Sequence, residues 1–136
     1  MKGACLCGDI TYALTASPEL RVVCHCSHCQ KQTGSAFSVL YAIPREHVRI
    51  DGSPGTYIDH GDSGKKVNRI FCRRCGSSVA ADAEIAPHLI FMFGGTLEDI
   101  SLLTPERQIF CESAQPWVHL EGLESYARLP AQSGDG

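Results

Sequence analysis

The sequence lacks long runs of basic residues and long runs of apolar residues. Its 136 residues carry a formal net charge of −3, and no basic run is longer than a pair such as Lys65 and Lys66. Nucleic-acid backbones and anionic membranes attract clustered basic side chains, so neither is expected to be the main partner. The longest apolar stretch, around residues 89–93, is also far too short to span a bilayer.

The first residues, MKGACLCGD, lack the apolar core that an export signal requires. We therefore expect a cytoplasmic protein, in a compartment that keeps thiols reduced. The chain contains no recognisable domain linker, and its length suits a single domain. We expect this domain to cover residues 1–129 and residues 130–136 to form a flexible tail.

Cysteine, by contrast, is abundant, and most of the cysteines are grouped. Disulfide pairing is one alternative, but no export signal supports it. A redox C-x-x-C is another, but the CRRC of residues 72–75 leads into a glycine turn rather than into a helix. Metal binding explains the spacings better. The eight cysteines are Cys5 and Cys7, then Cys24, Cys26 and Cys29, then Cys72 and Cys75, and the isolated Cys111.

Two of the groups predict a closed, structural zinc site. Cys5 and Cys7 form C-x-C, and residues two apart in an extended segment point to the same face. Cys72 and Cys75 form C-x-x-C followed by Gly76, the spacing of a zinc knuckle. Four thiolates complete a tetrahedral zinc site, which would tie the N-terminal strand to a distant hairpin.

The middle group predicts a second zinc with an open position. Cys24, Cys26 and Cys29 offer three thiolates from one tight turn. Three protein ligands and one open position are typical of a catalytic zinc. We expect the turn to direct its two histidines outward and the isolated cysteine to be a small core residue of a strand. The fourth ligand nevertheless stays open among three alternatives: His25, His28 and Cys111.

The two zinc ions expected per chain would differ in chemistry because their ligands differ in number. Three thiolates leave a divalent zinc with one net negative charge, and such an electron-rich centre is a weak Lewis acid that suits soft ligands. An incoming small thiol can bind there as its thiolate. The sequence identifies no general acid or base for a reaction at this centre.

Apolar alternation and turn residues predict a mostly β fold of several short antiparallel sheets. Residues 9–15 and 36–43 alternate, with every second side chain expected to face inward. Residues 48–51 and 55–59 are expected to form a hairpin. The continuously apolar residues 88–95 are expected to form a buried central strand.

Few short helices are expected. Residues 27–33 are expected to form one or two helical turns stopped by Gly34. Residues 107–113 (RQIFCES) resemble another strand, and residues 121–126 (EGLESY) a short closing helix. Trp117 is expected to be a core anchor, as a single tryptophan in a small β domain often is.

Five segments, taken in order, resemble a known family. The sequence is similar to the glutathione-dependent formaldehyde-activating enzyme family, which also includes the centromere protein V homologues. The resemblance extends from about residue 3 to residue 126, nearly the whole chain. Its segments are GACLCGDITY (3–12), CHCSHCQKQTGSAF (24–37), RIFCRRCGSSV (69–79), GGTLEDI (94–100) and CESAQPWV (111–118).

This resemblance implies a zinc-containing, Mss-four-like β fold that is shared with methionine sulfoxide reductase B. It implies a closed zinc at the first and last cysteine groups and a catalytic-type zinc at the middle group. It also implies condensation of formaldehyde with glutathione to S-(hydroxymethyl)glutathione, which is classed as a carbon–sulfur lyase reaction. Ala4 stands where the family often has a second glycine, and Cys111 is additional, but neither difference removes a ligand.

The segment that follows the open zinc is expected to form the rim of its pocket. Thr33, Gly34 and Ser35 would offer N–H groups and hydroxyls to a substrate, or would serve only as a helix end. The function predicted is a zinc-dependent carbon–sulfur lyase acting on glutathione, or a similar thiol, and a small aldehyde or its S-adduct. The alternatives are a non-catalytic zinc module that binds a protein, and a chromatin or microtubule binder, which the acidic balance disfavours.

Overall fold

Most of the regular secondary structure in the described residues lies in two β-sheets, so the prediction of a mostly β protein is confirmed. The computed structural model describes residues 1–61, 64–102 and 104–130. The tail expected at residues 130–136 therefore lies, except for its first residue, outside the described residues. The smaller sheet has three antiparallel strands in the order β1 (Lys2–Ala4), β2 (Thr11–Leu14) and β5 (Val48–Asp51).

The larger sheet has eight strands within the described residues. Its pairs are antiparallel except at one edge, where β10 runs parallel to both β3 and β11. Its order is β11 (Glu124–Ser125), β10 (Arg107–Ile109), β3 (Leu20–Cys24), β4 (Ser38–Pro44), β9 (Leu89–Phe93), β8 (Ser78–Ala83), β7 (Lys66–Phe71) and β6 (Gly55–His60). The apolar strand expected near residues 88–95 is thus confirmed as β9, inside this sheet.

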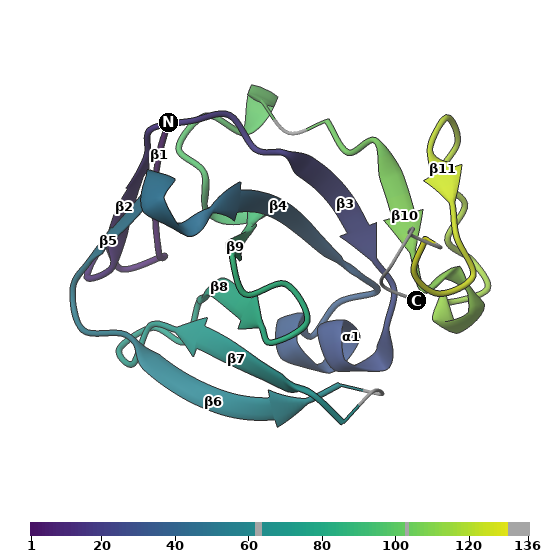
Figure 1. The fold of residues 1–136 in the computed structure, drawn as a ribbon, viewed down its shortest axis with the longest axis horizontal. Coiled ribbons are helices and arrows are strands. Elements are labelled where there is room, and N and C mark those ends of the chain that lie inside the picture. Colours follow the sequence, from purple (N-terminus) through teal and green to yellow (C-terminus); the bar gives the residue numbers. More distant parts are fainter. Residues whose placement is uncertain (62–63, 103, 131–136) are drawn as a thin grey trace.

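Helix α1 (Ser27–Thr33) lies between two parts of the large sheet. Figure 1 shows the small sheet at one end of the molecule and β10 and β11 at the other, with α1 between the β3–β4 pair and the β6–β7 hairpin. No helix in the described residues is both long and apolar enough to cross a membrane. The remaining helical segments are short 3₁₀ turns: η1 (Arg45–His47), η2 (Gly94–Thr96), η3 (Ile100–Leu102) and η4 (Cys111–Ser113).

The ends of α1 follow local rules, and its predicted bounds are confirmed. Cys26 is the N-cap, because its Sγ accepts the N–H of Cys29 at 3.3 Å. At the other end Gly34 adopts a left-handed φ of 66° and donates its N–H to the carbonyl of Gln30 at 2.8 Å. A residue with a side chain would be strained there, so glycine ends the helix at this point.

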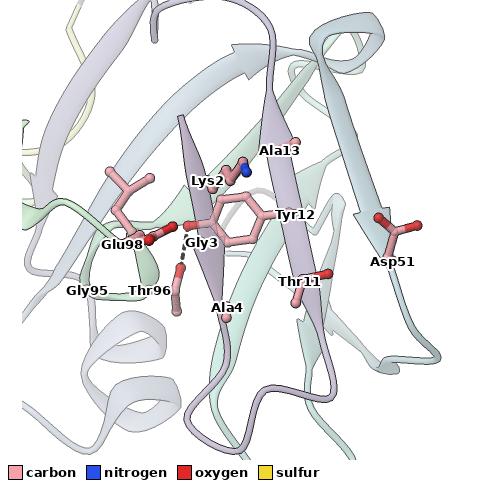
Figure 2. A pocket seen from close by; sticks show the side chains of 11 residues that line it. Lys2, Gly3, Ala4, Thr11, Tyr12, Ala13, Asp51, Gly95, Thr96 and Glu98 are labelled. Carbon is pink, nitrogen blue, oxygen red and sulfur yellow. Dashed lines mark hydrogen bonds between the residues drawn. The ribbon is translucent and has the colours of Figure 1, made fainter.

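The alternation of residues 9–15 is confirmed on one face of the small sheet. Ile10, Tyr12 and Leu14 are all buried. The Tyr12 ring crosses directly over Gly3, its partner on β1, and a Cβ added to Gly3 would collide with that ring. The Tyr12 hydroxyl is hydrogen-bonded to the Thr96 hydroxyl at 2.6 Å (Figure 2). Gly3 therefore allows the Tyr12 ring to cross β1 and its hydroxyl to reach Thr96 in η2.

Two apolar clusters make up the core of the described residues, and each includes cysteines from one of the predicted zinc sites. The first joins the small sheet to the centre of the large sheet and includes Tyr41, Ile43, Val79, Ile90 and Met92 together with Cys5 and Cys72. The second lies beneath α1 and includes Val22, Leu40 and Phe93 together with Cys24 and Cys29. Each sulfur group is therefore anchored in the packed interior by two buried cysteines.

The expected hairpin between residues 48–51 and 55–59 is wrong. β5 pairs with β2 in the small sheet, whereas β6 pairs with β7 in the large sheet. The intervening glycine and proline do form a turn-like link, but it carries the chain from one sheet to the other. Val48 and Ile50 pack against the first core cluster, so burial rather than nearness in sequence selects the partner of β5.

Three expectations for the C-terminal part are also wrong. The strand expected over residues 107–113 ends at Ile109, because Phe110 has a φ of 55° and turns the chain into η4, where Cys111 lies. The helix expected over residues 121–126 is replaced by β11. Trp117 is no core anchor: it is 69% exposed, and its indole N–H donates to Gln115 on its own segment at 2.7 Å.

Candidate metal centres

Four cysteine sulfurs from two distant segments converge on one point. The Sγ atoms of Cys5, Cys7, Cys72 and Cys75 all lie within 4.8 Å of one another. The first pair lies in a turn after β1 rather than in the extended segment expected from the sequence, and the second pair lies in the turn between β7 and β8. The donor set is that of a closed tetrahedral site, so these residues could hold a soft divalent ion such as zinc.

Backbone N–H groups support the sulfurs of this four-cysteine group. The N–H of Ile10 points at Cys5 Sγ over 3.3 Å, and the N–H groups of Arg74 and Cys75 point at Cys72 Sγ over 3.4 and 3.5 Å. Such donors stabilise the charged form of a thiol. The side chain of Ser77 lies 3.2 Å from Cys75 Sγ, and this hydrogen bond is the main reason why the pKa of Cys75 is lowered to about 5.

Three further sulfurs converge at the start of α1. Cys24 ends β3, Cys26 caps the helix and Cys29 lies in its first turn, and their Sγ atoms lie within 4.8 Å of one another. Cys24 and Cys29 are buried. Among the described residues, no further cysteine, histidine or carboxylate joins this group. The three-cysteine group could therefore hold a metal ion with one position left for another ligand.

The structure brings none of the three proposed fourth ligands into this group. His25 is completely buried rather than directed outward, and its Nε2 is hydrogen-bonded to Gln108 Oε1 at 2.8 Å. His28 Nδ1 is bonded to Asp59 Oδ2 at 2.7 Å. The Cys111 thiol points to the Gln108 carbonyl at 3.7 Å. Each of these side chains has a partner elsewhere.

Crowding sets the charge of the three-cysteine group. Hydrogen bonds from Cys24 and Cys26 lower the pKa of Cys29 to about 2. Hydrogen bonds to Cys26 and Cys29, together with burial, strongly raise the pKa of Cys24. Three thiols this close repel one another when ionised, so only a cation between them would allow all three to be thiolates. This electrostatic demand fits a divalent metal ion.

Sequence reasoning missed a buried charge beside this group. Arg69 is 6% exposed, and its Nη1 lies 4.0 Å from Cys29 Sγ. Its guanidinium is also paired with Asp59. A signal was available in the sequence, because Arg69 alternates with the apolar Val67 and Phe71, which is the spacing of side chains on one face of a strand. A charge at such a position requires an explanation.

Two pockets border α1, the helix that starts at the three-cysteine group, although none of these three cysteines lines either pocket. One, of about 360 Å³, is polar and is lined by Ser27, His28, Lys31, Gln32, Tyr57, Asp59 and Arg69. The other, of about 400 Å³, includes Thr33, Phe37, Ser38 and the glycines of η2, and it is also lined by Cys75 of the four-cysteine group. A larger pocket of about 550 Å³ lies against the small sheet (Figure 2), but no cysteine lines it. We place the chemistry at α1, where the sulfurs are.

The predicted substrate-binding residues lie at the end of α1. Thr33 lines the second of these pockets. Its hydroxyl donates to the Cys29 carbonyl at 2.8 Å, and the N–H groups of Gly34 and Ser35 both donate to the Gln30 carbonyl. These bonds end the helix. A contact between these three residues and a substrate stays a prediction.

Comparisons with known proteins point to one family. The family model described as "Glutathione-dependent formaldehyde-activating enzyme" matches residues 1–113. A protein of Aspergillus terreus, provisionally named as such an enzyme, is 32% identical over 74 residues, which are 53% of this chain and 38% of that protein. A protein of Aspergillus flavus with the same provisional name is 28% identical over 83 residues, which are 60% of this chain and 43% of that protein.

A solved structure is similar in fold. The crystal structure of a Rhodobacter sphaeroides protein matches with a TM-score of 0.57 and 22% identity, covering 72% of this chain and 88% of that chain. At this identity the likeness concerns the fold alone. The matches to the Aspergillus proteins span only about two fifths of those proteins' length.

Proposed function

The chain belongs to the glutathione-dependent formaldehyde-activating enzyme family, and from this premise we propose that it is a zinc-dependent carbon–sulfur lyase. Its substrates would be glutathione, or a similar thiol, and a small aldehyde or the S-adduct of the two. In the forward direction the sulfur bonds to the aldehyde carbon, and the thiol proton ends on the aldehyde oxygen. The reverse reaction splits the adduct. We propose that it acts in the cytoplasm and that residues 1–129 form one zinc-binding catalytic domain.

We assign the two sulfur groups different roles. Cys5, Cys7, Cys72 and Cys75 would hold a structural zinc whose four positions are all filled. Cys24, Cys26 and Cys29 would hold a second zinc, which when bound would supply a soft site for the sulfur of the thiol. The observation that carries the proposal is that three sulfurs, those of the buried Cys24 and Cys29 and of the partly buried Cys26, converge without a fourth donor among the described residues.

Side chains around the two pockets at α1 would position the substrates. They would hold the thiol and the aldehyde together and exclude water, and such positioning supplies much of a rate enhancement for a two-substrate reaction. Thr33, Gly34 and Ser35, at the end of the helix that starts at the three-cysteine group, are the residues that we propose for the rim of the substrate site.

The proposal is tested with zinc-loaded protein and two matched ligands. Glutathione should raise the melting temperature, because it binds the folded state, whereas S-methylglutathione, which has no free thiol, should not. Cys26→Ser should abolish this shift yet keep the fold, because serine is itself a preferred N-cap and can accept the Cys29 N–H. Production of S-(hydroxymethyl)glutathione from formaldehyde is then followed by NMR.

Two outcomes would count against the proposal. Equal stabilisation by glutathione and its S-methyl form would mean that the free sulfur is not what the protein recognises. No stabilisation by either, with two zinc ions bound per chain in native mass spectrometry, would favour the alternative of a non-catalytic zinc module.

A further inference from the structure

Arg69 is a buried cation in contact with the three-cysteine group. It lies within β7, is 6% exposed, and places Nη1 4.0 Å from Cys29 Sγ. Burying a guanidinium is unfavourable unless anions lie close to it. The anions available to Arg69 are therefore informative about what the site is built to hold.

Asp59 fixes the orientation of this guanidinium. Nε and Nη2 of Arg69 lie 3.3 and 3.2 Å from the same Asp59 oxygen, Oδ2. The two residues are diagonal neighbours in the β6–β7 pair, where Asp59 faces Val67 and Tyr57 faces Arg69. The same oxygen also accepts a hydrogen bond from His28 on α1. Asp59 thus holds one edge of the guanidinium and leaves Nη1 directed to Cys29.

The four-cysteine group has no equivalent cation among the described residues. Arg73 and Arg74 lie between Cys72 and Cys75, but both are exposed: Arg73 donates to the Pro54 carbonyl at 3.3 Å, and Arg74 pairs with the exposed Asp9 at 3.2 Å. Solvent screens such a surface pair, so its effect on the sulfurs is small. The group expected to be closed therefore has a screened cation, whereas the group with an open position has a buried one.

Charge counting shows what a buried cation does at an open centre. Three thiolates and a divalent ion carry one net negative charge. A thiolate as fourth ligand adds a second negative charge, which is costly in a buried site unless a cation lies close by. A neutral fourth ligand adds no charge and so gains little from the arginine.

We propose that Arg69 is a specificity-determining positioning residue, whose buried charge makes the three-cysteine centre prefer an anionic fourth ligand, a thiolate, over a neutral one. This inference rests on the proposed function, because it requires a metal-loaded open centre. The inference goes beyond the proposed function because it names a residue outside the cysteine motifs that determines which ligand charge the centre prefers. Asp59 acts through Arg69 by holding the guanidinium in place.

The test compares two ligands that differ in charge when bound. Full-length protein is loaded with Co²⁺, and 2-mercaptoethanol or imidazole is titrated at fixed pH while the visible absorption of the metal is followed. 2-Mercaptoethanol binds as a thiolate and has no carboxylate of its own to contact an arginine, whereas imidazole binds as a neutral ligand. Arg69→Gln should weaken 2-mercaptoethanol about tenfold or more and leave imidazole nearly unchanged.

Two further variants control for shape and for general charge. Arg69→Lys keeps a cation and should retain most of the preference for the thiol, and it carries the test alone if Arg69→Gln does not fold. Arg74→Gln removes a cation beside the other sulfur group and should change neither affinity.

Several results would overturn the inference. An unchanged thiol affinity in Arg69→Gln would do so, and so would equal losses for both ligands, which would mean that Arg69 only supports the shape of the site. Loss of the preference in a folded Arg69→Lys protein would also contradict it. If the unmodified protein bound no thiol at all, the proposed function would fail, and this inference with it.

Discussion

At the residue scale, the neighbours of each sulfur decide how readily it ionises. Cys75 is a partly exposed member of the four-cysteine group, and the Ser77 hydroxyl lies 3.2 Å from its sulfur. This hydrogen bond stabilises the thiolate and lowers the pKa of Cys75 to about 5. In zinc-free protein Cys75 should thus be a thiol below pH 5 and a thiolate above it.

Alkylation should report this difference directly. In zinc-free protein, the rate at which iodoacetamide labels Cys75 should rise through about pH 5 and level off above it, as followed by peptide mass spectrometry. Ser77→Ala removes the hydrogen bond and should move the midpoint to higher pH, whereas the neighbouring Ser78→Ala should not. Zinc should protect Cys75 but not Cys111, which lies outside both groups. A midpoint near pH 8.5, about that of a free cysteine, would contradict the prediction.

Some residue roles could be predicted from the sequence, and others could not. The two sulfur groups were predictable because metal-ligand spacing is a local signal, and the structure brings the expected cysteines together. Arg69 and Asp59 were not predicted, because each gains its role from a contact with α1 formed across 40 and 31 residues of chain. The burial of His25 depends in the same way on Gln108, which lies 83 residues away.

At the scale of elements, features set by neighbouring residues were predicted from the sequence, whereas features set by distant contacts were not. The bounds of α1 were predicted because its cap and its terminal glycine lie inside the segment. The hairpin at residues 48–59 was wrong because its two strands join different sheets, and the turn between them carries no information on partners. The early end of β10 depends on the left-handed backbone of Phe110, which no residue preference would suggest.

The pairing of β1 with β2 offers a test of packing at this scale. The Tyr12 ring fills the space above Gly3, and its hydroxyl reaches Thr96. Gly3→Ala should force the ring away and lower the free energy of unfolding by about 1–3 kcal/mol, as measured by urea denaturation. The matched control is Gly95→Ala, where an added Cβ meets nothing within 4 Å. If both variants were equally stable, the ring would not be confined as the structure indicates.

At the scale of the whole molecule, the two sulfur groups differ in how much chain they connect. The four-cysteine group joins the turn after β1, next to the small sheet, to the β7–β8 turn of the large sheet, and Cys7 and Cys72 are 65 residues apart. The three-cysteine group spans only the residues between β3 and α1. Closing a long loop restricts the unfolded chain more than closing a short one, so the first group should dominate stability.

Stepwise zinc removal should therefore abolish thiol binding first and reduce stability only in a second step. A chelator should first remove the zinc of the three-cysteine group, with loss of thiol binding and little change in far-UV circular dichroism. Removal of the second zinc should lower the melting temperature of the whole domain, because metal affinity at that site adds to folding stability.

Cys72→Ser should reproduce the second step and lower the free energy of unfolding by about 3 kcal/mol or more, since it opens the long link between the sheets. Cys26→Ser should cost less than about 1 kcal/mol, because serine preserves the helix cap. Both values come from urea denaturation of the zinc-loaded proteins. A Cys72→Ser protein with an unchanged unfolding curve, or unfolding on release of the first zinc, would show that the two groups do not divide stability and chemistry between them.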